Sequence, residues 1–247
     1  MAVYGGPNIV TDGLKVCLDA ADLNSYPGSG TTWYDLSGNG YNGTMTNGPT
    51  FDSDGGGCLS FTAGSTHYVD VTSPPGLKTY SSMCIWFNTG VDSEGLWDLS
   101  MADSTGTKNV DDFGPELDSS GYLTGWALSR NGAYPATRDD WTMFQVNTDF
   151  RDNTWHYLVN TFANGTGKTY VDGVYKGQDG AWAWYDWDEG TQAIMHIGKK
   201  HHYHYYGGGA GDHPFTGKLN GVQLYHKTLS AEEVLHNFTV HRGRYGV

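Results

Sequence analysis

A loop near the N-terminus carries oxygen ligands at the spacing of a calcium site. Asp35-x-Ser37-x-Asn39-Gly40 matches the first half of an EF-hand loop, in which alternating oxygen atoms coordinate the ion. Position 12 of such a loop, where a bidentate Glu belongs, is Thr46, so an EF-hand is excluded. Two interpretations remain: a structural calcium site at Asp35, Ser37 and Asn39, or a tight turn capped by Asp35 and Ser37, which is favoured. In that turn three glycines would adopt backbone angles that other residues avoid: Gly38, Gly40 and Gly43.

A cluster of imidazoles follows late in the chain. His201, His202 and His204 lie in a loop rich in Gly and Tyr, and neutral imidazole is a common ligand of transition metals. Three closely spaced histidines do not readily build a tetrahedral site alone, although His213 could complete one. A polar loop without a metal is the favoured interpretation, because short metal motifs are often coincidental.

Aromatic residues supply the stronger binding signal. An exposed indole or phenol offers the apolar face of a sugar ring a flat partner with a polar rim. Aromatic residues are equally typical of protein interfaces, so the sequence leaves glycan binding and subunit contact as equal alternatives. The predicted glycan- or partner-binding residues lie in two neighbouring segments: Trp182, Trp184, Tyr185 and Trp187, followed by Tyr203, Tyr205 and Tyr206.

Paired carboxylates for glycoside hydrolysis are missing from the expected strands. A retaining hydrolase needs two carboxylates about 5–5.5 Å apart. The acidic run Asp186-Trp187-Asp188-Glu189 comes closest, but it lies in a turn-like stretch bounded by glycines, and Asp111-Asp112 and Glu116 lie in another predicted loop. No Ser/His/Asp or Cys/His arrangement and no phosphate-binding glycine loop is evident. The sequence therefore predicts a protein that is not an enzyme.

The elements that position these residues are short strands. The segment 152–178 predicts three strands joined by two turns, the second of them at Asp172-Gly173. Its first strand is apolar on both faces, with Tyr157 and Val159 on one and Leu158 and Phe162 on the other. Such a strand belongs inside a sandwich.

Further strands are predicted on both sides of this meander. The segment 91–118 is predicted to be irregular with strand fragments at most, such as Leu96–Leu99, and 199–212 to be a loop. Ser230-Ala231-Glu232-Glu233 is a capping box that predicts a short C-terminal helix. The predicted strands are 14–19, 59–61, 68–71, 82–88, 122–129, 143–146, 193–198 and 217–225. We expect an arm over 1–13, a single domain over 14–240 and a tail over 241–247.

Three segments resemble the laminin G-like (concanavalin A-like lectin/glucanase) family. They are the central W-H-x-x-V…T-F…N-G…K-x-Y-V-D-G, the closing segment 215–238, and the opening Leu18-Asp19-Ala20…Tyr26-Pro27-Gly28…Trp33 to Gly43. The opening resembles laminin G-like domains in virion proteins of marine bacteriophages. The resemblance implies an all-β, concanavalin A-like antiparallel β-sandwich (jelly roll) with one short C-terminal helix. Glucanase relatives place their carboxylates as E-x-D-x-x-E, and this motif is absent here.

The composition agrees with a single β-sandwich and argues against two classes of binding partner. The 247 residues include 36 glycines, about twice the usual share of ~7%, as many tight turns require. The net charge of −13 argues against binding to nucleic acid or to an anionic membrane surface. Cys17, Cys58 and Cys84 form no disulfide framework, and Cys17 and Cys84 lie in apolar runs typical of buried thiols. No hydrophobic leader follows Met1, so we expect folding in a reducing cytosol.

The resemblance implies a non-enzymatic virion structural protein, either capsid decoration or a tail-fibre or adhesin component. It would be made in the host cytoplasm, exposed on the particle, and bound to other virion proteins or to copies of itself, without membrane insertion. The alternative is a lectin module that recognises a host-surface glycan. A glycan-cleaving enzyme is the third and least favoured class. No cofactor is required beyond the possible structural calcium.

Overall fold

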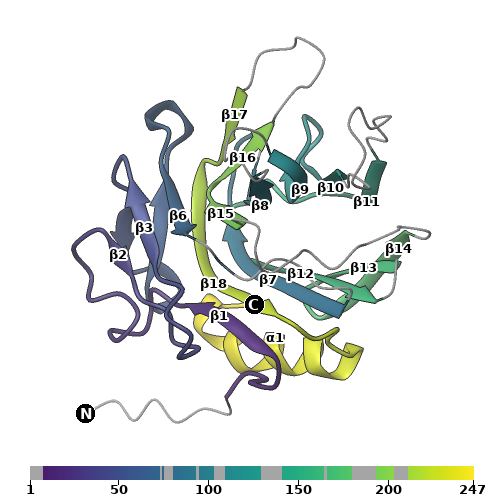
Figure 1. Cartoon of the computed structure of the whole chain (residues 1–247), viewed down its shortest axis with the longest axis horizontal. Coiled ribbons are helices and arrows are strands. Elements are labelled where there is room, and N and C mark those ends of the chain that lie inside the picture. The colour runs from purple at the N-terminus through teal and green to yellow at the C-terminus, as the bar shows by residue number, and fades with distance from the viewer. Residues whose placement is uncertain are drawn as a thin grey trace.

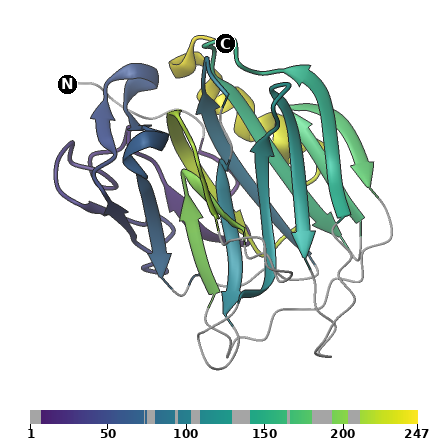
Figure 2. The ribbon, with the colours of Figure 1, turned by 90° about the horizontal axis from the view of Figure 1, so that it is seen from above.

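Two large antiparallel sheets stacked face to face form the body of the protein. A computed structural model describes residues 8–72, 74, 80–92, 95–102, 109–128, 141–163, 166–179, 193–202 and 211–247. Figure 1 and Figure 2 show the two layers, whose strands run in roughly the same direction, as expected for an aligned sandwich. The one α-helix among the described residues, α1 (Ala231–Tyr245), lies outside one layer, and two single-turn 3-10 helices, η1 (Asp54–Gly56) and η2 (Ala63–Ser65), lie in loops. The prediction of an all-β sandwich with a C-terminal helix is confirmed.

We call the layer beneath the helix sheet A and the other layer sheet B. Both contain neighbours that are far apart in sequence, as jelly-roll connections require. In spatial order, sheet A consists of β14 (Val174–Asp179), β13 (Thr166–Val171), β12 (His156–Ala163), β7 (Tyr80–Asn88), β18 (Gly217–Tyr225), β5 (Cys58–Phe61) and β4 (Thr50–Asp52), with β1 (Leu14–Leu18) paired to β18. Sheet B consists of β11 (Trp141–Asp149), β10 (Tyr122–Leu128), β9 (Asn109–Leu117), β8 (Trp97–Ala102), β15 (Ala193–Ile197), β6 (Tyr68–Thr72), β3 (Gly43–Thr46) and β2 (Thr32–Trp33).

Alternation along the strands builds the core between the sheets. On β12, Leu158 and Phe162 face sheet B, whereas Tyr157 and Val159 face the helix, so the prediction of two apolar faces is confirmed. The turn after β13 also matches its prediction. Asp172 and Gly173 have φ values of 54° and 75°, and two consecutive positive φ values match the twist of the flanking strands.

The outer face of sheet A is closed by α1. Trp86 of β7 stacks on Tyr245 at 4.0 Å and on Phe238 at 5.7 Å between ring centroids. The helix begins as the capping box predicts: the Ser230 side chain accepts a hydrogen bond from the backbone N–H of Glu233, and the Glu233 side chain accepts one from Ser230. It continues to Tyr245, which is buried, so the residues predicted to form a tail from 241 onward are mostly helical.

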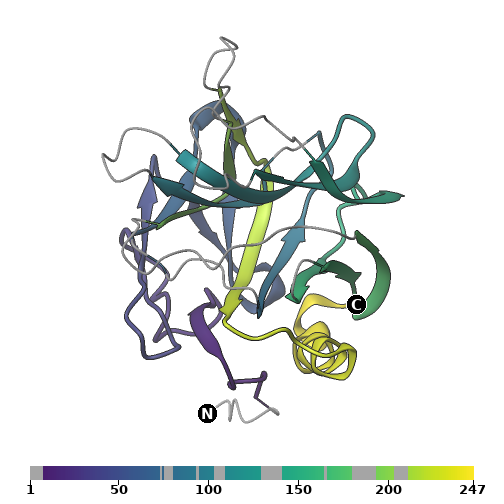
Figure 3. The ribbon, with the colours of Figure 1, turned by 45° about the vertical axis from the view of Figure 1, so that its right-hand side comes forward.

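Other predictions are wrong. The segment 91–118, predicted to be irregular with strand fragments at most, contains two full strands, β8, which overlaps the predicted fragment Leu96–Leu99, and β9. Strand β11 is longer than the predicted 143–146. The predicted loop 199–212 contains β16 (Lys199–His202) and β17 (Gly211–Pro214). These two strands pair with each other as a separate two-stranded sheet, which lies near the top of the view in Figure 3. In each case cross-strand pairing stabilises segments whose composition disfavours strands.

The cysteines behave as small apolar residues. Cys17, Cys58 and Cys84 are buried and free, which confirms the prediction for Cys17 and Cys84. Burial raises the pKa of all three thiols to about 12, so they are not reactive thiolates at neutral pH. Among the described residues, no helix has the length and apolar character needed to cross a bilayer.

Candidate functional site

The aromatic residues predicted to bind glycan or partners lie outside the described residues. So do the acidic run 186–189 and His204, and the side chains of His201 and His202 are not described. His213 lies in β17, partly buried, and its backbone carbonyl accepts a hydrogen bond from Gly95. Binding at the following positions therefore stays a prediction: Trp182, Trp184, Tyr185, Trp187, Tyr203, Tyr205 and Tyr206.

The predicted calcium loop is described and is held by its own hydrogen bonds. Asp35 Oδ1 accepts from the N–H groups of Cys17 and Ser37, both at 2.9 Å. Asp35 Oδ2 accepts from Ser37 Oγ at 2.7 Å and from the N–H of Tyr41 at 3.0 Å. The Asn39 amide donates to the carbonyl of Lys15 at 3.0 Å. These contacts account for the turn, and bound calcium stays a prediction.

The glycines of this loop differ in their roles. Gly38 and Gly40 have φ values of 85° and 82°, as expected for a turn that other residues avoid. Gly43 does not share this conformation. A Cβ atom there would lie 2.6 Å from Val69 Cγ1, so close packing in sheet B requires this glycine, and the prediction for its backbone angle is wrong.

The opening motif contributes a buried ion pair. The Asp19 carboxylate accepts hydrogen bonds from two nitrogens of Arg244, at 2.8 and 3.0 Å, and from the amide of Asn220 at 3.1 Å. Burial alone would raise the pKa of Asp19, but Arg244 holds it below its usual value. This contact ties β1 to β18 and α1, which is a structural role.

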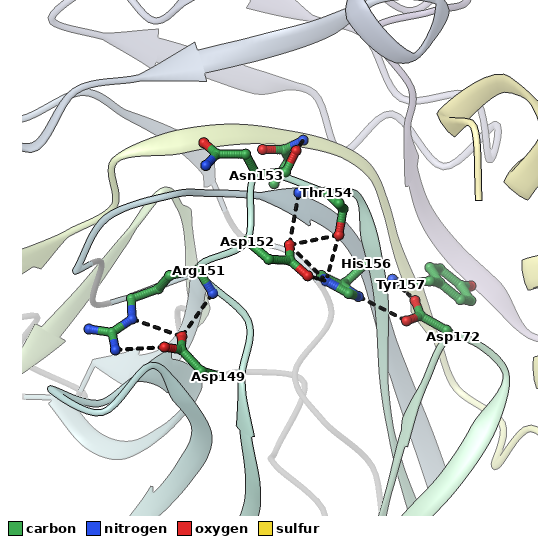
Figure 4. A network of polar contacts seen from close by, with 9 residues as sticks. Asp149, Arg151, Asp152, Asn153, Thr154, His156, Tyr157 and Asp172 are labelled. Carbon is green, nitrogen blue, oxygen red and sulfur yellow. Dashed lines mark hydrogen bonds and ion pairs between the residues drawn. The ribbon is translucent and has the colours of Figure 1, made fainter.

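A polar network lies at one end of the sandwich (Figure 4). His156, at the start of β12, contacts Asp172 through Nδ1 at 2.8 Å and Asp152 through Nε2 at 3.3 Å. The Asp172 carboxylate also accepts from the N–H of Tyr157 at 2.8 Å, and Asp152 accepts from the hydroxyl of Thr154 at 2.6 Å. His156 therefore joins the turn before β12 to the turn after β13, next to the backbone hydrogen bond that the N–H of Asp172 donates to the carbonyl of Tyr157 at 2.9 Å.

The electrostatics of this network favour the charged imidazole. Burial alone would lower the pKa of His156, but the hydrogen bond to Asp172 and the two carboxylates raise it above its usual value. Nearby, two nitrogens of Arg151 each donate to the Asp149 carboxylate at 2.8 Å, a bidentate contact that lowers the pKa of Asp149 to about 2. Arg151 also contacts Asp92.

A second imidazole with two carboxylates lies in the middle of sheet B. His196 of β15 contacts Asp70 of β6 through Nε2 at 3.3 Å and Asp98 of β8 through Nδ1 at 3.4 Å. The three residues are directly opposite one another in the ladder. Their neighbours in sequence, Val69, Leu99 and Met195 among them, point into the core, so the three polar side chains lie on the outer face of the sheet.

Exposure differs along this row. The side chain of Asp98 is fully buried, that of His196 is 12% exposed and that of Asp70 is 31% exposed. Tyr68 lies edge-on to His196 at 5.9 Å, and the Lys199 ammonium lies 3.6 Å from the centre of the Tyr68 ring. Lys200, also buried, contacts Glu116 at 3.4 Å. We call Asp70, His196 and Asp98 the sheet B row.

Sequence reasoning missed this row. Its only signal is one polar residue between apolar neighbours in each strand, as in Val69-Asp70-Val71 and Trp97-Asp98-Leu99. Such alternation predicts an outward side chain but does not show which strands are neighbours.

Several of the described carboxylates lie in pairs, and each such pair contacts one basic side chain. Besides the two histidines and Arg151, Lys218 contacts Asp52 and Asp54, both at 3.0 Å, and Lys227 contacts Asp12 and Glu233. Hydrolysis of a glycosidic bond needs a sugar or water between its two carboxylates. In each of these pairs one basic side chain of the protein contacts both carboxylates, so none of these pairs is arranged for that reaction.

Comparisons with known proteins agree with this architecture. The sequence model of the concanavalin A-like lectin/glucanases superfamily matches residues 63–235. No curated protein matches the sequence. Among solved structures, domain 4 of an extracellular arabinanase from Geobacillus stearothermophilus, in complex with arabinotriose, is similar with a TM-score of 0.60 and 16% identity, over 91% of this chain and 97% of that domain.

Toxin domains form a second group of similar structures. The binding domain of Paraclostridial Mosquitocidal Protein 1 has a TM-score of 0.62 and 13% identity over 92% of this chain. The binding domain of botulinum neurotoxin DC, in complex with rat synaptotagmin II, has a TM-score of 0.61 and 13% identity over 94% of this chain. The alignment covers 52% of either toxin domain, so the chain spans about half their length.

Proposed function

Because the chain belongs to the concanavalin A-like lectin/glucanases superfamily, we propose that it is a carbohydrate-binding domain that does not cleave its ligand. The observation that carries the proposal is the pairing of several described carboxylates. Each pair shares an Arg, Lys or His side chain, for example Asp52 and Asp54 with Lys218. Carboxylates held in this way can accept hydrogen bonds from hydroxyl groups but are not placed on either side of a glycosidic bond.

The similar structures support binding as the role. The arabinanase domain, which aligns with this chain over 97% of its length, was determined in complex with an oligosaccharide, arabinotriose. The toxin domains are binding domains, one of them in complex with synaptotagmin II. At 13–16% identity this support is analogy at the level of the fold, so the ligand must be argued from the residues of this chain.

Binding without cleavage is tested with purified full-length protein on a glycan microarray and in affinity gel electrophoresis with soluble polysaccharides. We expect at least one polysaccharide to retard the protein without release of reducing ends. Release of reducing ends from a bound polysaccharide would overturn the non-enzymatic half of the proposal. Failure to bind any glycan in either assay would overturn the carbohydrate-binding half.

The predicted aromatic segments belong to the same proposal, as a partner-facing or glycan-facing edge. The double variant Trp184→Ala/Trp187→Ala, with folding checked by circular dichroism, distinguishes the two. Each anchoring ring typically contributes on the order of 1–2 kcal/mol, so losing two is measurable. Weaker glycan binding by the double variant would show that these rings contact the sugar. Unchanged glycan binding would show that they do not, and would leave contact with a protein partner as their role.

A second candidate function is a structural component of a virion, favoured by the opening motif Leu18-Asp19-Ala20…Trp33 to Gly43. In this alternative the protein is made in the host cytoplasm, carried on the particle, and bound to other virion proteins or to copies of itself. Co-purification of the protein with phage particles through a density gradient would support this role. Its absence from particles produced by the same host would reject it.

A further inference from the structure

We propose that the sheet B row binds the hydroxyl groups of a neutral sugar, with Asp70 as the residue that touches the ligand. The inference rests on the proposed function and locates its site. Asp70 is the most exposed member of the row, at 31%, and its neighbour across the ladder, Thr44, is exposed as well. A carboxylate beside an exposed hydroxyl matches the alternating donors and acceptors of a sugar.

The two sheets differ in the side chains on their outer faces. On sheet A, Trp86, Tyr157 and Val159 pack against α1, so that face is closed by an apolar cluster. The outer face of sheet B instead carries polar side chains along successive strands. From β3 to β11 the described ones that are at least partly exposed include Thr44, Asp70, His196, Glu116 and Gln145.

The sheet B row is not needed to join its strands. His196 lies directly opposite both Asp70 and Asp98, in strands whose backbones are already hydrogen-bonded to each other. The basic side chains that other carboxylate pairs share have a different role. His156 links two turns, and Lys227 links the N-terminal Asp12 to the first turn of α1. Buried ionisable groups are common at functional sites, because apolar residues of similar volume would often be at least as stable in their place.

Burial assigns the roles within the row. Asp98, fully buried, contacts Nδ1 of His196 and fixes the orientation of the ring, so it is a positioning residue. The Nε2 atom of His196 then contacts Asp70 and orients its carboxylate. Asp70, Thr44 and the partly exposed Tyr68 remain accessible to a ligand. A sugar hydroxyl donating to the Asp70 carboxylate would form a charge-assisted hydrogen bond.

The charge of the site favours neutral sugars over anionic ones. The protein carries a net charge of −13, and the accessible ionised group of the row is a carboxylate. The neighbouring ammonium groups are buried and engaged: Lys199 lies over the Tyr68 ring and Lys200 contacts Glu116. An anionic polysaccharide would therefore meet repulsion at long range and at contact.

The test compares Asp70→Ala with Asp152→Ala. The two side chains are a matched pair, since each is a partly exposed carboxylate that contacts Nε2 of a histidine at 3.3 Å. Wild type and both variants are run in gels containing arabinan, laminarin or xylan as neutral probes and alginate as the anionic probe. We expect a neutral probe to retard wild type and Asp152→Ala equally, and Asp70→Ala to bind it about tenfold more weakly, the loss expected of a charge-assisted hydrogen bond.

The outcomes separate the site from the function. Equal binding by wild type and Asp70→Ala would overturn the site and leave the proposed function intact. A preference for alginate would overturn the ligand class. A wild type that binds no glycan on the microarray or in the gels would overturn the proposed function and the site with it. If Asp70→Ala is unfolded by circular dichroism, the near-isosteric Asp70→Asn is measured in its place, with Asp152→Asn as its control.

Discussion

Replacing Phe238 by alanine should strongly destabilise the protein without touching the proposed sugar site. Phe238 is 7% exposed, and its ring stacks on Trp86 at 5.7 Å and lies 6.4 Å from the ring of Tyr157. The Phe238→Ala variant removes the ring and leaves a cavity between α1 and sheet A. Because the cavity is lined by two large aromatic side chains in a strand ladder, the surroundings cannot easily close it.

The expected loss follows from the burial. Truncating a buried Phe to Ala costs about 3–5 kcal/mol. One side of the ring is bordered by the exposed Arg242, whose guanidinium lies 5.6 Å from the ring centre, so we expect the lower value, about 3 kcal/mol. Domains of this size typically have unfolding free energies of roughly 5–15 kcal/mol, so the variant should remain folded.

Urea denaturation, followed by tryptophan fluorescence, measures the loss as a lower midpoint at unchanged slope. Leu235→Ala is the control, since Leu235 lies on the same helix and is 51% exposed. It should cost less than about 1 kcal/mol. Equal losses for Phe238→Ala and Leu235→Ala would refute the packing of α1 against sheet A. Loss of glycan binding in folded Phe238→Ala would refute the assignment of the site to the other sheet.

Two further predictions concern pH and metal. His156 has a raised pKa in the folded state, so its contribution to stability is present below its ordinary value of 6.5 and is lost as pH rises through the folded value. His156→Gln should therefore lose more unfolding free energy relative to wild type at pH 5.5 than at pH 8.5, and an equal or larger loss at pH 8.5 would contradict the network. For the loop at Asp35, Asp35→Ala should lower the unfolding free energy by about 1–3 kcal/mol, because several donors lose their acceptor. A chelator should leave the melting temperature of wild type unchanged, whereas a drop that only calcium restores would establish a metal site.

Local sequence signals predicted the elements that depend on nearby residues. The turn at Asp172-Gly173 and the capping box at Ser230 are each specified within a few positions, and both are present in the structure. The two-faced strand β12 was also predictable, because alternation with apolar residues on both sides requires a layer on each side. These features need no knowledge of the rest of the fold.

The segment 91–118 could not be predicted in the same way. It contains Gly95, Gly114 and Pro115, residues that disfavour strands, and a high density of acids. In the structure β9 lies between β8 and β10 and is paired along both sides. The backbone hydrogen bonds supplied by two neighbours outweigh the low propensity of the segment, and those neighbours are not visible in its own sequence.

The two imidazole clusters show why the site was harder to predict than the fold. His156 lies four residues from Asp152 and sixteen from Asp172, so the turns of one meander bring the three together. In the sheet B row, Asp98 is 98 residues from His196 in sequence, and Asp70 is farther still. They meet only because β15 lies between β6 and β8, an order that no local pattern reveals. A histidine between two carboxylates thus has two different consequences. His156 links the turns at Asp152 and Asp172, whereas His196 positions the partly exposed carboxylate of Asp70 on the outer face of sheet B.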